Sequence, residues 1–142
     1  MARVVAGVGP TRPRVQVAAS GGGRIVHMND DEALEFCQNL PSAELTHPFG
    51  FETAVMKVRG RVFAILPLHS EVASITLKSE PADAEALVRE HAAVTPGYHM
   101  NKRHWITVTL DGSLPDGLDE ELIRESYRLV IAALPKARRP VA

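Results

Sequence analysis

The chain has 142 residues, 45% of them hydrophobic and 23% charged, a length and composition that fit one globular domain and exclude a mostly disordered chain. No apolar run is long enough to span a membrane, and a single cysteine excludes an intrachain disulfide scaffold, so we expect a cytoplasmic protein without membrane contact. Residues 1–28 contain four arginines and no acid, so the remainder holds 12 of the 16 basic groups against all 17 acidic ones, a balance of −5 that counts against tight non-specific nucleic-acid binding by the folded part.

The first 27 residues mix glycine, proline, arginine and valine without a helical or strand period, and the run at 20–23 is typical of a linker. We therefore predict a disordered leader at 1–27, a folded domain at 28–135 and a short basic tail at 136–142.

The first helix is predicted at residues 30–39. Asn29 can cap it, Glu32 at its third position completes the pattern of a capping box, and Pro41 ends it. The apolar stripe at helical spacing consists of Ala33, Leu34, Cys37 and Leu40.

The segment His47-Pro48-Phe49-Gly50 follows this helix. We expect it to shape the turn into a hairpin, with Gly50 in an unusual φ and Phe49 inserted into the core.

The hairpin itself is predicted over residues 53–66, because Arg59-Gly60 separates two apolar strands and glycine supplies the positive φ of a tight turn. A two-residue turn pairs Met56 with Phe63. The side chains that then face the core are Met56, Phe63 and Ile65. A one-residue bulge would exchange the side chains that the hairpin presents to the core with those that it presents to the open face.

Alternating residues predict further strands at 74–78 and 104–110, and helical spacing predicts helices at 81–91 and up to about residue 134. The predicted order is α-β-β-β-α-β-α. Strands with one apolar and one polar side need helices on only one face, so the fold class is α+β, with a mostly antiparallel sheet, helices on one face and the other face open to solvent.

The open face is the first candidate for a binding surface. Its strands contribute Lys57, Thr76, Lys78, Trp105 and Thr107, and Arg59 sits at the hairpin tip. Cationic side chains around a tryptophan suit phosphate contacts with base stacking, or a cation–π contact with a ligand. The alternative is that lysine and threonine keep this face soluble while Trp105 covers its middle.

The segment from Pro96 to Trp105 is the most unusual stretch of the chain. Its side chains can donate to phosphate, stack on a ring or titrate near neutral pH. The candidate binding residues in it are Tyr98, His99, Asn101, Lys102, Arg103, His104 and Trp105. Charged loops are often merely solvated, but the aromatic residues favour a binding role for this one.

Several segments, in this order along the chain, resemble the MmcQ/YjbR family of small bacterial domains. They are residues 47–50, 57–60 leading into Phe63-Ala64, 75–78, 96–108 and 122–127, which together span about residues 30–135. The resemblance implies a frataxin-like (CyaY-like) α+β fold, often called a double-wing arrangement, and a DNA-binding role, with residues 99–105 as the functional surface.

Metal binding and catalysis are weaker alternatives. The two loop histidines, even supported by His47 or Cys37, lack the ligand spacing of a structural zinc site. The acids at 30–35 are similar to the iron-binding helix of frataxins, but the helix dipole accounts for them. No catalytic motif is found, and Cys37 falls where an inert buried thiol is expected, so we expect no enzyme, metal or cofactor. Nucleic acid is therefore the first candidate partner, ahead of a small anionic ligand or a protein.

Overall fold

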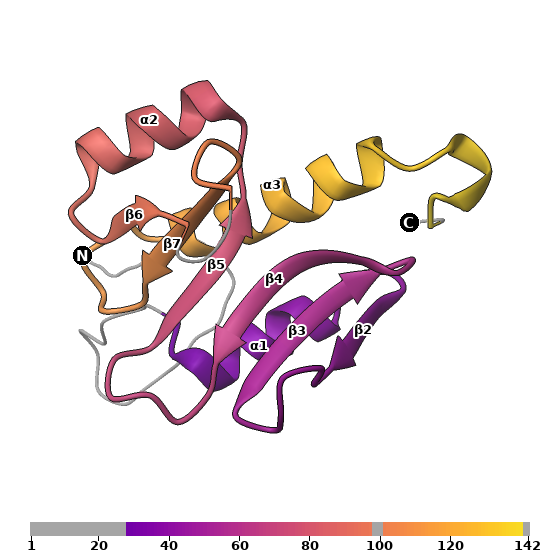
Figure 1. The fold of residues 1–142 in the computed structure, drawn as a ribbon. Helices are drawn as coiled ribbons and strands as arrows, with labels where there is room; N and C mark the ends of the chain where they lie inside the picture. The colour runs from indigo at the N-terminus through magenta and orange to yellow at the C-terminus, as the bar shows by residue number, and fades with distance from the viewer. Residues whose placement is uncertain (1–27, 98–100, 141–142) are drawn as a thin grey trace.

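The computed structural model describes residues 28–97 and 101–140, and in these ranges the chain forms three α-helices and a six-stranded sheet (Figure 1). The helices are α1 (Asp30–Gln38), α2 (Pro81–Glu90) and α3 (Leu118–Ala132), and a short 3-10 helix, η1, covers Lys136–Arg138. The strands are β2 (Ala43–Thr46), β3 (Thr53–Val58), β4 (Arg61–Pro67), β5 (Ser74–Lys78), β6 (Val94–Pro96) and β7 (Trp105–Thr109).

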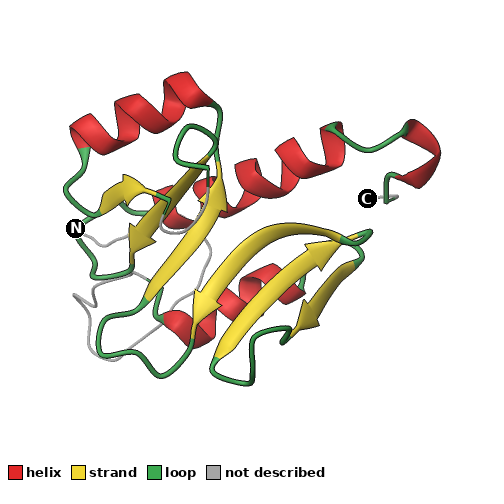
Figure 2. Ribbon diagram, in the orientation of Figure 1, coloured by secondary structure: helices red, strands yellow, loops and turns green. Residues whose placement is uncertain are grey.

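All neighbouring strands are antiparallel, in the spatial order β2-β3-β4-β5-β7-β6. In the view of Figure 2, α1 and α3 pass behind the sheet, so no described helix covers the near side of β3, β4 and β5. The predicted α+β class, an antiparallel sheet with helices on one face, is confirmed.

Two strands of the sheet were not predicted, so the observed order is α-β-β-β-β-α-β-β-α. Both form edges of the sheet: β2 has four residues and β6 has three. Edge strands are often this short, and neither β2 nor β6 alternates between buried and exposed residues, which is the signal that sequence patterning detects.

The helix starts follow the sequence signals. The Asn29 side chain accepts a hydrogen bond from the Glu32 amide at 2.8 Å, and the Glu32 carboxylate accepts one from the Asn29 amide at 3.0 Å, so the predicted capping box is confirmed. Pro81 stands in the first turn of α2, as expected. Among the described residues, no helix is both long and apolar enough to cross a membrane.

The hairpin contains a bulge that changes its register. Val58 lies opposite Arg61 as predicted, but Met56 lies opposite Ala64 because Phe63 is an extra residue in β4. Met56 and Phe63 are both fully buried, which confirms them as core residues. The Phe63 ring packs edge-on against Tyr127 of α3, with 5.4 Å between ring centres.

Because of the bulge, the side chains of β4 that follow Phe63 point to the opposite faces from those predicted. Ile65 lies opposite Thr76 of β5, on the open face, and is half-buried. The prediction that Ile65 enters the helix-covered core is therefore wrong, because the extra residue at Phe63 shifts the alternation of the strand by one.

The expected core position of Phe49 is also wrong: its side chain is 76% exposed, and that of Phe51 is 83% exposed. Gly50 has a φ of 102°, as predicted. Its amide donates to the His47 carbonyl at 3.2 Å, and its carbonyl accepts from Thr53 at 3.3 Å. Two successive tight turns keep this backbone at the surface, so the phenylalanine side chains point away from the core.

Candidate nucleic-acid interface

The candidate loop leaves the sheet after β6 and returns at the start of β7. The Gly97 amide donates to the Trp105 carbonyl at 2.8 Å and closes the base of the loop. A Cβ atom on residue 97 would lie 2.6 Å from the Cβ of Trp105, so the two backbones can approach this closely only with glycine. This contact fixes where Trp105 enters the sheet.

Asn101 organises the described part of the loop. Its side-chain oxygen accepts from the Arg103 amide at 3.0 Å, and its carbonyl accepts from the His104 amide at 3.1 Å, which is the pattern of an Asx turn. The Lys102 ammonium lies 3.5 Å from the Gly97 carbonyl. Lys102 and Arg103 are thus exposed on an ordered turn, with Asn101 acting mainly as the residue that shapes it.

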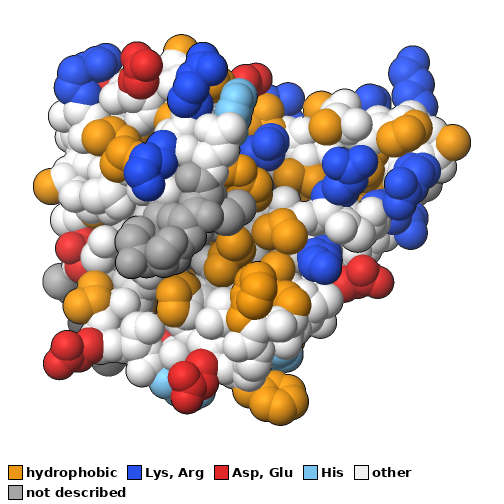
Figure 3. Space-filling view, in the orientation of Figure 1, with side chains coloured by type: hydrophobic (Ala, Val, Ile, Leu, Met, Phe, Trp, Pro, Cys, Tyr) orange, Lys and Arg blue, Asp and Glu red, His pale blue; other side chains and the backbone are white. Residues whose placement is uncertain are grey.

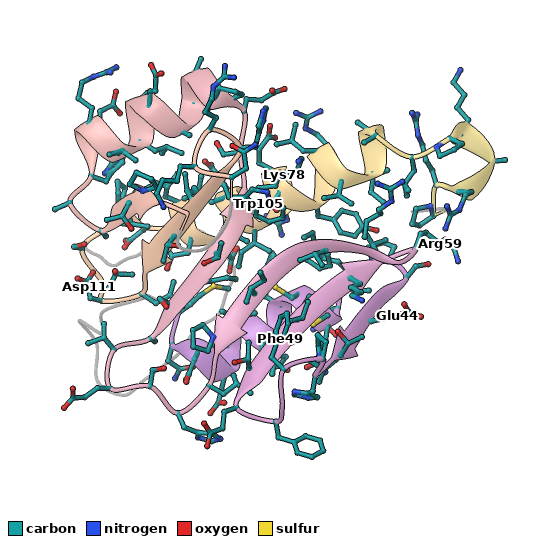
Figure 4. The ribbon with its side chains drawn as sticks, in the orientation of Figure 1. Glu44, Phe49, Arg59, Lys78, Trp105 and Asp111 are labelled. Atoms are coloured by element: carbon teal, nitrogen blue, oxygen red, sulfur yellow. The ribbon has the colours of Figure 1, made fainter. Side chains whose placement is uncertain are left out.

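Trp105 and Lys78 face each other across neighbouring strands. The two residues are paired in the β5–β7 register, and the Lys78 ammonium lies 5.3 Å from the centre of the indole ring (Figure 4). Both side chains are half-buried. This is a cation–π contact, and it leaves a cation beside an aromatic ring on the open face.

The predicted threonines bond to each other rather than standing free. The hydroxyls of Thr76 and Thr107 are 2.9 Å apart, and the Thr95 hydroxyl donates to the Thr107 carbonyl at 3.4 Å. Thr76 is only 8% exposed. These bonds link β5, β6 and β7 on the same face as Trp105, so we assign the threonines a role in stabilising the sheet.

The other half of the open face is more apolar than predicted. Figure 3 shows hydrophobic side chains over β3 and β4, where the register places Val62 and Ile65. Lys57 is half-buried there, opposite Val62 on one side and Glu44 of β2 on the other. Glu44 was missed by the sequence reading, because β2 itself was missed.

Arg59 lies at the tip of the β3–β4 turn with a φ of 51°, and its Nε donates to the Arg138 carbonyl at 3.1 Å. Figure 4 places it apart from Lys78 and Trp105. The predicted site residues therefore fall into a loop cluster (Lys78, Asn101, Lys102, Arg103, His104 and Trp105) and a hairpin cluster (Lys57 and Arg59). The two further candidates, Tyr98 and His99, lie outside the described residues.

The loop cluster carries net positive charge. Among the described residues there is one ion pair, between Arg128 and Glu125 at 2.7 Å. The hydrogen bond from Arg128 lowers the pKa of the Glu125 carboxyl. None of Lys78, Lys102 and Arg103 pairs with a described carboxylate. Cationic groups that are not neutralised by a carboxylate can bind external anions such as phosphates.

The described residues form no cluster of three or more potential metal ligands. Cys37 is fully buried in α1, and burial raises the pKa of its thiol to about 12. A thiol of this kind is protonated at neutral pH, which makes it a poor nucleophile.

An antiparallel sheet with one helix-covered face and a basic, aromatic loop defines a small open-faced α+β domain. The model of the YjbR family matches residues 38–129, from the end of α1 to near the end of α3. The chain belongs to the YjbR family.

Known relatives support this assignment. YjbR of Escherichia coli K12, named as an uncharacterized protein, is 36% identical over 112 residues, which are 79% of this chain and 95% of that protein. YyaQ of Bacillus subtilis, also named as uncharacterized, is 34% identical over 83 residues, or 54% of this chain and 70% of the relative. The crystal structure of Deinococcus radiodurans protein DR2400, a DUF419 domain, has 39% identity and a TM-score of 0.74, with 78% of this chain and 85% of that one covered. These names state no activity.

Proposed function

We propose that this member of the YjbR family binds nucleic acid through the loop cluster, as a binding protein without catalytic activity. The observation that carries the proposal is the Lys78–Trp105 contact at the foot of the exposed turn with Lys102 and Arg103. A tryptophan beside several cations combines the two interactions that single-stranded nucleic acid offers, base stacking and phosphate contact.

The distribution of charge sets the expected character of binding. Residues outside 1–28 have a balance of −5, so attraction must come from local cations rather than from the whole surface. We therefore propose binding that is weak at physiological salt and strengthens as the salt concentration falls, with a slope set by the few phosphates that the local cations contact.

Trp105 is the only tryptophan, so its fluorescence reports on this site. Titration of the full chain at low ionic strength with a mixed-sequence single-stranded oligonucleotide should quench the emission in a saturable manner. The Trp105→Ala substitution should weaken binding by about 1–3 kcal/mol, the usual contribution of one stacked base, and Trp105→Phe should weaken it less. Because these variants lack the tryptophan, their binding is measured by the anisotropy of a labelled oligonucleotide.

The same titration separates nucleic acid from the alternatives. Emission that responds to inorganic phosphate as strongly as to the oligonucleotide would favour a small-anion site. Unchanged emission with every oligonucleotide would contradict stacking on Trp105.

One observation favours a protein partner as a second candidate. Phe49 and Phe51, in the same turn, are 76% and 83% exposed, and exposed large apolar side chains are typical of interaction sites. Phe49→Ser with Phe51→Ser should leave oligonucleotide binding unchanged if this turn serves another partner. Loss of oligonucleotide binding in that variant would assign the turn to the nucleic-acid surface instead.

A further inference from the structure

Arg59 and Arg138 hold each other's backbone, although they lie 79 residues apart in the chain. The Nε of Arg59 donates to the Arg138 carbonyl at 3.1 Å, and the Nη2 of Arg138 donates to the Arg59 carbonyl at 3.1 Å. These bonds attach η1 to the tip of the β3–β4 hairpin. They also bring two guanidinium groups to the same junction, where an anion that contacts both would offset the repulsion between their like charges.

Arg139 adds a third guanidinium to the same region. It donates to the Leu134 carbonyl and to the Ala132 carbonyl, both at 3.0 Å, and so caps the C-terminal end of α3. A guanidinium has more N–H donors than these two bonds use, so each of the three arginines retains donors for a ligand. None of the three pairs with a carboxylate among the described residues.

The surface beside Arg59 and Arg138 is hollowed. A groove of about 480 Å³ is lined by Ser42, Ala43, Glu44, Arg59, Gly60 and Arg138. Glu44 is the one acid in this lining, and Lys57 is its cross-strand neighbour. Figure 3 shows Lys and Arg side chains gathered along the margin where Figure 1 has the end of α3 and the hairpin tip.

We propose that Arg59, Arg138 and Arg139 form a second phosphate-binding surface, which extends the nucleic-acid interface from the loop cluster onto the C-terminal segment. This inference rests on the proposed function. Guanidinium groups suit it because their planar donors match phosphate oxygens in pairs. Nucleic-acid backbones present many phosphates along one strand, so two basic clusters on one domain can bind one oligonucleotide together.

The test compares three variants of the full chain by anisotropy of labelled duplex and single-stranded oligonucleotides across a range of salt concentrations. Arg138→Gln with Arg139→Gln removes two charges but keeps side-chain amides that can donate to the same carbonyls. It should weaken binding and flatten the plot of log affinity against log salt by about 0.9 per lost phosphate contact on the duplex. Arg89→Gln with Arg124→Gln removes the same charge from residues outside both clusters and should change the slope much less.

Glu44→Gln should change the affinity in the opposite direction, and it leaves the three arginine side chains in place. Removal of the one acid in the groove should tighten binding, a result that a purely structural role of this region does not predict. Wild-type protein that binds while both Arg138→Gln/Arg139→Gln and Glu44→Gln leave affinity and salt slope unchanged would overturn this inference alone. Wild-type protein that does not bind at low salt would overturn the proposed function and this inference with it.

Discussion

The Ser126 hydroxyl donates to the Phe63 carbonyl at 2.6 Å, which joins the middle of α3 to the bulge of β4. The same hydroxyl accepts from the Lys78 amide at 2.9 Å, at the end of β5. Only Ala64 and Ile65 of β4 pair with β5. One buried serine therefore bonds to both strands beyond the point where their pairing ends, directly beneath the Lys78–Trp105 contact.

Ser126→Ala should reduce the free energy of unfolding by roughly 1–3 kcal/mol, because the carbonyl of the fully buried Phe63 and the part-buried amide of Lys78 would both lose their partner. Urea denaturation measures the change. Ser113→Ala, an exposed serine in the Asp111 turn, is the matched control and should change stability by less than about 0.5 kcal/mol. Equal effects of the two substitutions would argue against the bridging role of Ser126.

Phe63→Ala should cost roughly 3–5 kcal/mol, since it removes a fully buried ring that packs on Tyr127. The control is Phe51→Ala, which removes the same ring from a position that is 83% exposed and should be nearly neutral. An unchanged urea midpoint for Phe63→Ala would contradict the burial of the Phe63 side chain at the bulge.

Gly97→Ala should displace Trp105, because the new methyl group would lie 2.6 Å from the tryptophan Cβ. We expect a shift in the fluorescence of this single tryptophan and a loss of about 1–3 kcal/mol in stability, as overpacking usually causes. Gly117→Ala is the control: the added methyl meets no atom within 4 Å, but the φ of 85° is strained, so stability should fall without a change in Trp105 emission. Identical emission in all three proteins would contradict the close approach.

Cys37 should react with thiol reagents only when the protein unfolds. Burial raises the pKa of its thiol to about 12, so the thiolate that reacts is scarce throughout the neutral range and forms only as pH rises toward that value. The labelling rate at pH 8 should be slow in buffer and rise sharply through the urea transition. Fast labelling of the folded protein would show that α1 opens locally.

The sequence predicts those parts of the fold that depend on local chemistry. The capping box of Asn29 and Glu32 and the alternation that places Trp105 opposite the core need only neighbouring residues, and both are found. The position of Ile65 depends on a single extra residue at Phe63, and nothing in an apolar strand marks which residue bulges. Local signals therefore sufficed for the helices and the longer strands, but not for the short edge strands β2 and β6 or for the register of the hairpin.

The site residues also divide into those that are close in the sequence, which could be predicted, and those that only the fold brings together. The Asn101–Trp105 loop is contiguous in sequence, so its composition reveals it. The contact between Arg59 and Arg138 joins residues far apart in the chain, and only the packing of η1 on the hairpin tip brings them together. The basic residues after position 135 were visible as a tail, without any sign of what they would meet.

We propose that Lys102 and Arg103 contact phosphates from an ordered turn. The most direct test is the salt dependence of duplex and single-stranded oligonucleotide affinity for the wild-type chain and for Lys102→Ala/Arg103→Ala, measured by fluorescence anisotropy. Both side chains are exposed, so the fold and its thermal midpoint should be preserved. We predict weaker binding by the variant and a slope on duplex DNA that is shallower by about 0.9 for each lost contact. No binding of the wild-type chain at low salt, or identical slopes for the two proteins, would contradict the claim.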